Sequence, residues 1–360
     1  MITIKHPITF STDYPLERIA PLKELLFFDI ETTGFSGDTS RLYLIGCTWF
    51  DGFGWKMIQW FADSAQAERE LLDAFFSFME SFSVLIHFNG DRFDIPYLLK
   101  CCSRLGLPYN FDRIKSLDIY KIIRPFQKLL GLESMKQKSI EHFLGIRRED
   151  KYSGGELIPV YRDYLRTGDE HLYRLLILHN EDDLKGMPLI LPILSYSDML
   201  SSTFTLKESR LFSESDGFRL WLAFENTFSV PIPLEYELAP VSLEIHDNIL
   251  SGTISLFSGE LKYFYPDYKD YYYLPLEDMA VHKSVGCYVE PSARKRATAR
   301  TCYTKKEGLF LPLFGSIYEP SFREDYSSSL CYAEYQADFL DNPEQAADYA
   351  RQLLQFAGSL

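Results

Sequence analysis

The stretch LLFFDIETTGF, residues 25–35, decides the fold of the first half of the chain. Its apolar run is typical of a buried strand, and the strand delivers two acids, Asp29 and Glu31, at its far end. Residues two apart in a strand point to the same face, so both carboxylates are expected to project together while Ile30 turns into the core. By itself, such a pattern more often marks solvated acids without a function. The neighbouring segments therefore decide its meaning.

The segments around this strand are predicted to form one α/β unit. Strands are recognised by apolar or alternating runs between turn residues, and helices by apolar residues three or four apart. The expected elements are a strand at 24–30, a hairpin at 41–61, a helix at 65–81, a strand at 83–88, a helix at 91–108, a strand at 113–120, and helices at 134–144 and 170–194. Residues 1–20 are predicted to be irregular. This order, βββαβαβα, is that of an RNase H-like fold, a mixed sheet flanked by helices.

The second half of the chain has a different character. After about residue 200, helical periodicity gives way to short alternating runs between Gly, Pro and Asp turns. We expect an RNase H-like domain at 1–200 and a β-rich accessory domain at 201–360, with nucleic-acid or partner binding as its suggested task. The second domain is predicted to close with a helix at 341–357, because Asn342 is a good N-cap, Pro343 suits the first helical position and an apolar stripe follows.

Composition limits the possible functions. Because Asp and Glu number 51 against 37 Lys and Arg, the formal net charge is −14, which argues against nucleic-acid binding through overall charge but not through a local basic surface. The apolar runs are too short to span a membrane, and the N-terminal residues lack the pattern of a signal peptide. Scattered cysteines without C-x-x-C spacing fit a reducing compartment. We therefore expect a cytoplasmic protein without a membrane partner.

A second segment brings polar side chains to a strand–helix junction. In LIHFNGDRFDIPYLL, residues 85–99, Asn89 and Asp94 lie between a buried strand and the next helix. Side chains of different elements converge at this end of such a sheet, so an acid there is a candidate site residue. Asp118, in SLDIY on the following strand, is better explained as a structural residue or one that supports the site.

A third segment, LILHNEDDLKGMPL at 176–189, carries His179 and Asp183. The two are four residues apart on a predicted helix and therefore share one face. Alone, His179 would more often be a structural histidine, and the acids a solvated helix face. Asp182 is a rival for the site, but the spacing between Asp183 and His179 points both of these side chains the same way.

Together, these segments are expected to bring four acids from three elements to one edge of the sheet: Asp29, Glu31, Asp94 and Asp183. Without neutralisation, four such carboxylates would repel one another strongly. Divalent cations that prefer oxygen ligands, Mg²⁺ or Mn²⁺, resolve this conflict, and two such ions about 3.5–4 Å apart are a usual clamp for phosphoryl displacement. The sequence therefore predicts two divalent metal ions as cofactors.

The same segments resemble a known superfamily. FFDIETTG, HFNGDRFDIPYL and HNEDD are similar to the three motifs of the DEDD exonucleases, which include DnaQ-type proofreaders and the exonuclease domains of B-family DNA polymerases. The likeness is greatest to the YprB-like RNase H-like domain family, through ELIPVYRDYLRTGDEHLYRLLILHNEDDL at 156–184. The resemblance covers residues 22–195.

The resemblance implies roles for the acids. Asp29 would bridge two metal ions, and Glu31 and Asp183 would complete one of the two sites. Asp94 would anchor the other site. All four would be both metal ligands and catalytic residues.

The resemblance also implies roles for residues beside the acids. The superfamily usually carries Tyr four residues before the last Asp or His five residues before it, whereas this chain has His179 at the tyrosine spacing. The YprB-like family is similar in this respect, so His179 is predicted to orient or deprotonate the attacking water. Residues predicted to bind substrate from these motifs are Thr32, Asn89 and Phe93.

The implied activity is that of a metal-dependent 3′–5′ exonuclease, which hydrolyses phosphodiester bonds of single-stranded DNA or RNA. One alternative is a non-catalytic module of the same fold that grips nucleic-acid ends or a protein, and another is an RNase H-type endonuclease. The presence of all four acids favours catalysis. The choice between DNA and RNA depends on contacts to the 2′ position, which motif spacing does not reveal.

Two basic clusters are predicted to guide the nucleic acid. One lies between the second and third motifs and consists of Lys136, Lys138, Arg147, Arg148 and Lys151. The other is RKRATARTCYTKK at 294–306, with Arg294, Lys295, Arg296, Arg300, Lys305 and Lys306. This second cluster is either a phosphate track or a solvated loop. Substrate contacts are predicted for Lys136, Lys138, Arg294, Arg296 and Arg300.

An aromatic segment precedes the second basic cluster. KYFYPDYKDYYYLP, residues 262–275, concentrates tyrosines in a short span. Such residues can stack on single-stranded bases or form a cross-strand aromatic core. Of these two interpretations, we favour the core.

Overall fold

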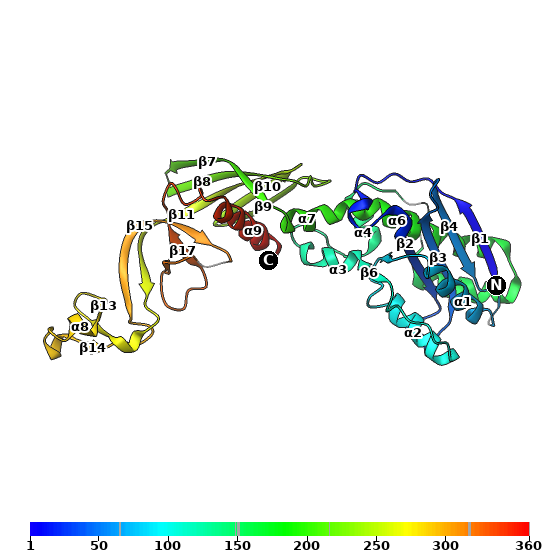
Figure 1. Ribbon diagram of the computed structural model, residues 1–360, viewed down its shortest axis with the longest axis horizontal. Coiled ribbons are helices and arrows are strands. Elements are labelled where there is room, and N and C mark those ends of the chain that lie inside the picture. Colours follow the sequence, from blue (N-terminus) through cyan, green and yellow to red (C-terminus); the bar gives the residue numbers. More distant parts are fainter. Residues whose placement is uncertain (65, 148, 150–151, 216, 316–317, 360) are drawn as a thin grey trace. The chain divides into compact units, whose positions relative to one another are not determined.

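The chain divides into two compact units (Figure 1). The structure is a computed structural model that describes residues 1–360 with the exception of 65, 148, 150–151, 216, 316–317 and 360. One unit comprises Met1–Gln127 and Gly131–Ser197, and the other Lys128–Leu130 and Asp198–Leu360. Each unit has its own sheet and its own buried apolar residues.

The first unit is built on a mixed sheet with the strand order β1-β4-β3-β2-β5-β6. Its strands are β1 (Ile2–Pro7), β2 (Leu25–Thr32), β3 (Leu42–Phe50), β4 (Trp55–Phe61), β5 (Val84–His87) and β6 (Lys115–Asp118). β2, β5 and β6 run parallel, whereas β1, β4, β3 and β2 pair in antiparallel fashion. The predicted mixed sheet is thereby confirmed.

The prediction of an irregular N-terminal segment is wrong for residues 2–7. These residues form β1, an edge strand whose pairing with β4 runs from Ile2 opposite Phe61 to Pro7 opposite Lys56. Its side chains alternate between half-buried and exposed. Such a short alternation carries little signal by itself, and the edge of β4 supplies the hydrogen bonds that make it a strand.

The helices of this part of the chain are α1 (Glu68–Met79), α2 (Asp94–Leu105), α3 (Ile119–Ile123), α4 (Gln137–Phe143), α5 (Gly154–Thr167), α6 (Glu170–Ile190) and α7 (Ser195–Ser201), and the last residues of α7 belong to the second unit. α1 packs on β3 and β4, and α6 packs on β2 and β3. α5 was not predicted, although Ser153 and Glu156 form a capping box at its start. The predicted helix at 170–194 ends earlier, and Leu191–Leu194 continues it as a 3-10 helix.

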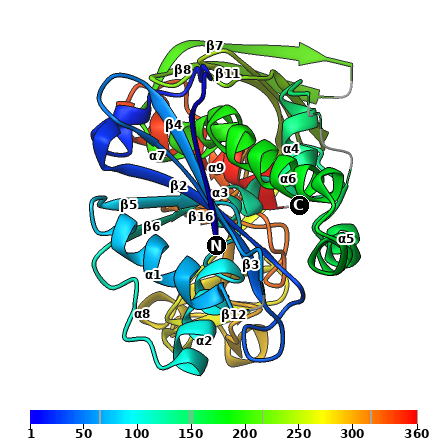
Figure 2. The same cartoon turned by 90° about the vertical axis from the view of Figure 1, so that its right-hand side faces the viewer.

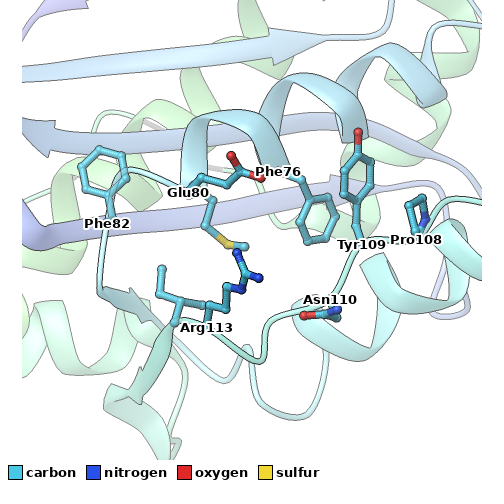
Figure 3. A pocket seen from close by; sticks show the side chains of 9 residues that line it. Phe76, Glu80, Phe82, Pro108, Tyr109, Asn110 and Arg113 are labelled. Carbon is cyan, nitrogen blue, oxygen red and sulfur yellow. The ribbon is translucent and has the colours of Figure 1, made fainter.

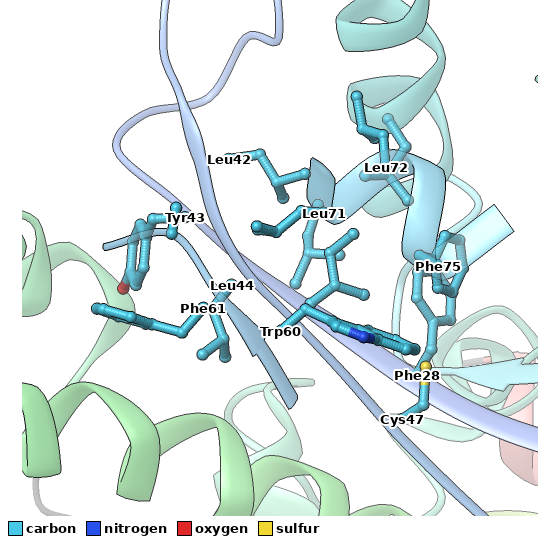
Figure 4. Close-up of a cluster of buried hydrophobic side chains, with 14 of the residues drawn as sticks. Phe28, Leu42, Tyr43, Leu44, Cys47, Trp60, Phe61, Leu71, Leu72 and Phe75 are labelled. Carbon is cyan, nitrogen blue, oxygen red and sulfur yellow. The ribbon is translucent and has the colours of Figure 1, made fainter. Parts of the chain in front are cut away.

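The two faces of β2 have different partners. Phe28 turns towards α1, where its ring stacks on Phe75 at 5.5 Å between centroids, within a large buried cluster (Figure 4). Asp29 turns the other way, towards α6, which crosses the sheet in Figure 2. Strand alternation therefore places Leu26, Phe28 and Ile30 of this cluster on the face opposite to the acids.

The second unit is β-rich, as predicted, and ends in a helix. Its strands are β7 (Phe204–Glu214), β8 (Gly217–Asn226), β9 (Leu234–Leu238), β10 (Val241–His246), β11 (Ile249–Phe264), β12 (Tyr271–Leu274), β13 (Met279–His282), β14 (Lys295–Arg296), β15 (Tyr303–Leu313), β16 (Ser321–Phe322) and β17 (Cys331–Glu334), and its helices are α8 (Lys283–Gly286) and α9 (Pro343–Ser359). The larger sheet has the order β16-β17-β15-β11-β10-β9, with β8 also pairing with β11, and the smaller sheet has the order β13-β12-β14. In the described part of the chain, no helix has the length and apolar character that a bilayer crossing requires.

The C-terminal helix confirms its sequence signals. The Asn342 side chain accepts the backbone N–H groups of Glu344 and Gln345 at 2.9 and 3.4 Å. The apolar stripe, which includes Tyr349 and Leu353, is buried. The Tyr349 hydroxyl donates to the Pro312 carbonyl at 3.0 Å, which ties α9 to β15.

The aromatic segment contributes to packing, in line with the interpretation favoured above. Tyr271 and Tyr273 lie on β12, and the Tyr265 ring stacks on the Tyr271 ring at 4.6 Å between centroids. Tyr265, Tyr268, Tyr271 and Tyr273 pack against a small buried cluster of Ala280, Ala297 and Cys302. These tyrosines remain partly exposed, so packing does not use all of their surface.

Candidate active site

β2 carries the first two acids of the site. Asp29 is half-buried and Glu31 is 6% exposed, on the face of the sheet that α6 covers. The Asp29 carboxylate accepts a hydrogen bond of 2.8 Å from the Asn180 side chain of α6. The Gln59 side chain of β4 in turn donates to the Asn180 oxygen at 2.9 Å. A polar relay from two further elements thus orients the carboxylate of Asp29.

Close packing of α6 on the sheet depends on Gly46 of β3, which lies opposite Asp29. A Cβ added at Gly46 would lie 2.1 Å from the Asn180 side-chain oxygen and 2.5 Å from Leu184. Only a residue without a side chain lets Asn180 approach the strand this closely. The glycine is therefore part of the support of the site.

α6 also brings His179 and Asp183 to the acids of β2. The His179 Nε2 atom lies 3.6 Å from a Glu31 oxygen and 3.7 Å from an Asp183 oxygen. Ligand atoms of these three residues all lie within 4.8 Å of one another, an arrangement that could hold a metal ion. The helical spacing of four residues thus places His179 and Asp183 on the same face, as the sequence indicates.

Asp94 is the first residue of α2 and is buried. Its carboxylate accepts hydrogen bonds from its own backbone N–H group and from that of Ile30, which joins the second motif to β2. Burial raises the pKa of Asp94 to about 7, and the nearby charges of Asp118 and Asp183 add to the rise.

The pKa of Asp29 is also affected by the neighbouring carboxylates. Burial raises the pKa of Asp29 well above its usual range, and the charges of Asp183, Glu31 and Asp94 raise it further. The Asn180 donor works in the opposite direction. Carboxylates gathered in this way, with a buried histidine beside them, form a donor set that suits divalent cations.

The two adjacent acids, Asp182 and Asp183, make different contacts. Asp183 faces His179, as described above. The Asp182 carboxylate accepts the backbone N–H group of Glu149 at 3.1 Å and is 8% exposed, so it ties α6 to the segment before α5. This geometry favours Asp183 at the site.

The segment with the second motif is held by a buried polar network. Asn89 has a positive φ of 64°, and its backbone N–H group donates to the Asp118 carboxylate at 2.9 Å. The N–H group of Asp91 also donates to Asp118, at 3.2 Å, and His87 Nδ1 accepts that of Gly90 at 3.0 Å. Asp118 thus supports the turn that leads to Asp94, in agreement with the role preferred from the sequence.

Hollows beside this turn are lined by aromatic and basic side chains. One, of about 590 Å³, is lined by Phe88, Asn89, Arg92, Tyr120, Ser134, Met135, Lys136 and Gln137. Another, of about 410 Å³, shares Arg92 and Tyr120 and adds Asp91, Asp118, Lys121, Arg124 and Pro125. The predicted substrate residues Asn89 and Lys136 therefore line the same hollow.

The other residues of this unit that are predicted to bind substrate make contacts within the chain, and their role stays a prediction. Thr32 donates its hydroxyl to the Gly34 carbonyl at 2.7 Å, which shapes the segment after β2. The Phe93 ring meets the Phe35 ring edge-on, with 6.5 Å between the ring centroids. Lys138 contacts the Tyr152 carbonyl. Two members of the first basic cluster, Arg148 and Lys151, lie outside the described residues.

The second basic cluster is partly neutralised. Lys305 pairs with Asp278 at 2.6 Å, and Lys306 with Glu334 at 2.6 Å. The Arg294 guanidinium lies over the Tyr272 ring, 4.6 Å from its centroid. Lys295, Arg296 and Arg300 are exposed. Acids far away in the sequence thus pair with the two lysines, and phosphate contacts of Arg294, Arg296 and Arg300 stay a prediction.

Some residues of the site escaped sequence reasoning. Asn180 and Gln59 gave no signal, because an amide next to an acid motif is common on helices. Tyr43 has a fully buried hydroxyl, and the carboxylates of Glu31 and Asp29 add to the effect of burial in raising its pKa. Phe35 is 93% exposed. In the sequence, only its position directly after the first motif indicates that it could contact a substrate.

One hollow of the first unit is separate from these residues. It has a volume of about 390 Å³ and is lined by α1 and the segment after α2, including Phe76, Tyr109 and Arg113 (Figure 3). None of the described residues that line it is a predicted site residue. It therefore adds nothing to the candidate active site.

Comparisons with known proteins show a similarity of this unit to RNase H-like domains. Residues 26–194 match the RNase H superfamily. The chain is similar to the DNA polymerases of Pyrococcus glycovorans (34% identity over 108 residues, 28% of this chain and 14% of the relative) and Thermococcus aggregans (34% over 119 residues, 31% and 6%). The predicted RNase H-like resemblance is thereby confirmed for this segment, while the finer likeness to the YprB-like family stays a prediction.

The similarity is limited in extent. The chain spans well under a fifth of the length of these curated relatives. Among solved structures, the family B DNA polymerase of Pyrobaculum calidifontis aligns with a TM-score of 0.40 and 15% identity, over 66% of this chain and 33% of that one. The family match lies within the first unit, and the comparisons leave the activity of the whole relatives aside.

Proposed function

We propose that the first unit is a metal-dependent 3′–5′ exonuclease that hydrolyses phosphodiester bonds of single-stranded nucleic acid. The observation that carries this proposal is the convergence of acids from β2, α2 and α6, of which Glu31 and Asp183 lie beside His179. Buried carboxylates repel one another unless cations neutralise them, so an arrangement that gathers them is costly without a ligand. Similarity to DNA polymerases makes a phosphodiester the natural substrate.

Asp29, Glu31, Asp94 and Asp183 would hold two divalent ions, Mg²⁺ or Mn²⁺. When bound, such ions supply charge stabilisation to phosphate oxygens and lower the pKa of water. Asn180 keeps the Asp29 carboxylate oriented for this purpose. We assign to His179 the role of accepting a proton from the attacking water, since its Nε2 atom lies beside Glu31 and Asp183.

The surroundings of the acids support a nucleic-acid substrate. Arg92 and Lys136 offer positive charge to phosphates, and the Tyr120 ring offers a surface to a base, in the hollow that Asn89 also lines. Phe35, after β2, and Phe93, the N-cap of α2, offer two further rings that contact each other. We assign the terminal nucleotide to this pair of rings.

The test uses end-labelled single-stranded DNA and RNA with Mn²⁺, Mg²⁺ or a chelator, with products resolved by length. We expect metal-dependent shortening from the 3′ end, and at least about a 10²-fold loss of rate in Asp29→Asn, by comparison with the loss of one preorganised electrostatic group. The matched control is Asp38→Asn, which changes an exposed acid of the segment that follows β2. Undiminished cleavage by the Asp29→Asn protein would refute the assignment.

The same assay separates the alternatives. A circular single strand has no end, so its cleavage would indicate an endonuclease. Retained binding without cleavage of any substrate, with either metal, would indicate a non-catalytic module. Each outcome contradicts the exonuclease proposal in a different way.

A further inference from the structure

A groove in the second unit is lined mainly by aromatic side chains. Its volume is about 500 Å³, and it lies where β11 ends. The lining includes Tyr263, Tyr265, Tyr268, Phe264 and Tyr326, with Arg323 as its cation. We call it the tyrosine groove. It belongs entirely to the second unit and is distinct from the candidate active site of the first unit.

The rings of the tyrosine groove are held in place by one another. Tyr265 stacks on Tyr271, and Tyr263 meets Tyr265 edge-on at 5.2 Å between centroids. The Tyr326 ring meets Phe264 edge-on at 5.5 Å. Rings fixed by such contacts lose little conformational freedom when a planar ligand stacks on them.

These aromatic side chains keep accessible surface. Tyr326 is 44% exposed, and Tyr263, Tyr265 and Tyr268 are half-buried. A core would have buried such rings completely, as it does with Phe310 on the neighbouring strand β15. The tyrosine groove therefore offers ring surface that the fold does not use.

The charges at the tyrosine groove suit an anionic strand. Arg323 lines it, and Ala299 on its wall directly precedes the exposed Arg300. The groove also contains Glu319, but this carboxylate accepts the backbone N–H group of Ser321 at 3.3 Å. With few cations and many rings, stacking rather than phosphate contact would carry most of the affinity.

We propose that the tyrosine groove binds single-stranded nucleic acid by stacking of its bases, as a second binding site for the strand that the first unit degrades. The choice of nucleic acid as the occupant rests on the proposed function. A groove of tyrosines with a glutamate could also hold a quaternary ammonium group, and the test treats that ligand as the competing outcome.

The test uses the full chain carrying Asp29→Asn, in chelator, so that no strand is cut. A labelled oligothymidylate that contains 5-iodouracil is bound and irradiated, and the cross-linked peptides are identified by mass spectrometry. We expect cross-links to the peptides that contain Tyr268 or Tyr326. Cross-links confined to peptides of the first unit would overturn the proposal.

Variants of the tyrosine groove give a quantitative readout of the same cross-link. Tyr326→Ala should reduce its yield at the groove about tenfold, and Tyr326→Phe should retain it, because stacking needs the ring and not the hydroxyl. Tyr288→Ala is the matched control, since this tyrosine is 88% exposed in the same unit but does not line the groove. Equal losses in Tyr326→Ala and Tyr288→Ala would contradict the assignment.

Two further outcomes bear on the choice of ligand. Affinity that falls with salt more steeply than a logarithmic slope of about −2 would show that phosphate contacts dominate and would overturn stacking as the mode of binding. Displacement of the strand by tetramethylammonium at equal concentration would identify the competing ligand. Because cleavage is not measured here, groove binding can succeed even where the wild-type protein fails to cut nucleic acid.

Discussion

The polar relay behind Asp29 offers the sharpest test of the site. Asn180→Ala removes the donor that lies 2.8 Å from the Asp29 carboxylate, while Gln59 keeps its bond of 3.1 Å to the Ile177 carbonyl. The change therefore removes support from one carboxylate without touching the acids themselves. Asn180→Ala thus tests the orientation of the Asp29 carboxylate while the charge of that carboxylate is kept.

The expected magnitude follows from the type of bond that is lost. A hydrogen bond to a charged group contributes about 1.5–3 kcal/mol. Residues that orient metal ligands typically change metal affinity by about 10–100-fold, which is the same range of free energy. We therefore expect the Mn²⁺ concentration at half-maximal rate to rise about 10–100-fold in Asn180→Ala. The maximal rate should return at saturating metal, because all four acids are still present.

The assay is a metal titration of strand cleavage, with thermal unfolding in chelator as a check that the variant folds. Asn110→Ala is the control, since it removes an exposed amide whose oxygen accepts the Asp112 N–H group at 3.1 Å, away from the acids. Asp29→Asn should not recover at any metal concentration. An unchanged metal requirement in Asn180→Ala, or a loss of rate that metal does not restore, would refute the role given to this relay.

Three further predictions concern neighbouring residues. Asp183→Asn should lower the rate of cleavage at least about 10²-fold, whereas Asp182→Ala should chiefly lower the melting temperature, because it removes the acceptor of the Glu149 N–H group. Burial raises the pKa of Asp94 to about 7 from an ordinary 3.8, so the protein in chelator should lose stability as the pH rises from about 4 through about 7. Added Mn²⁺ should raise the melting temperature most above that range. A melting temperature in chelator that does not change with pH would contradict this prediction. Phe35→Ala should raise KM about tenfold with kcat little changed, because its exposed ring is assigned to a base and not to the reacting phosphate; an unchanged KM would exclude that contact.

The acids of the site could be predicted because their spacing is local. In β2, alternation alone places Asp29 and Glu31 on one face, and in α6 a spacing of four residues does the same for His179 and Asp183. These relations follow from backbone geometry, which holds wherever a strand or a helix forms. The N-cap of α9 was predictable for the same reason, since Asn342 acts on residues two and three positions ahead.

Other features depend on partners that lie far away in the sequence. The bond between Asn180 and Asp29 joins residues 151 positions apart, and its existence requires the close approach that Gly46 permits. Lys305 looks like a free cation in its own segment, yet the fold brings Asp278 to it. Likewise β1 becomes a strand because β4 offers it an edge.

Local sequence patterns are thus enough to predict which acids share a face, which elements carry them and where the C-terminal helix begins. That Asp183 rather than Asp182 turns towards His179, that Asn180 supports Asp29 and that the basic cluster at 294–306 is partly neutralised follows from the packing of distant segments. The physical reason is that periodicity is set by covalent geometry within a few residues. The pairing of charges and amides depends instead on how distant segments pack against one another.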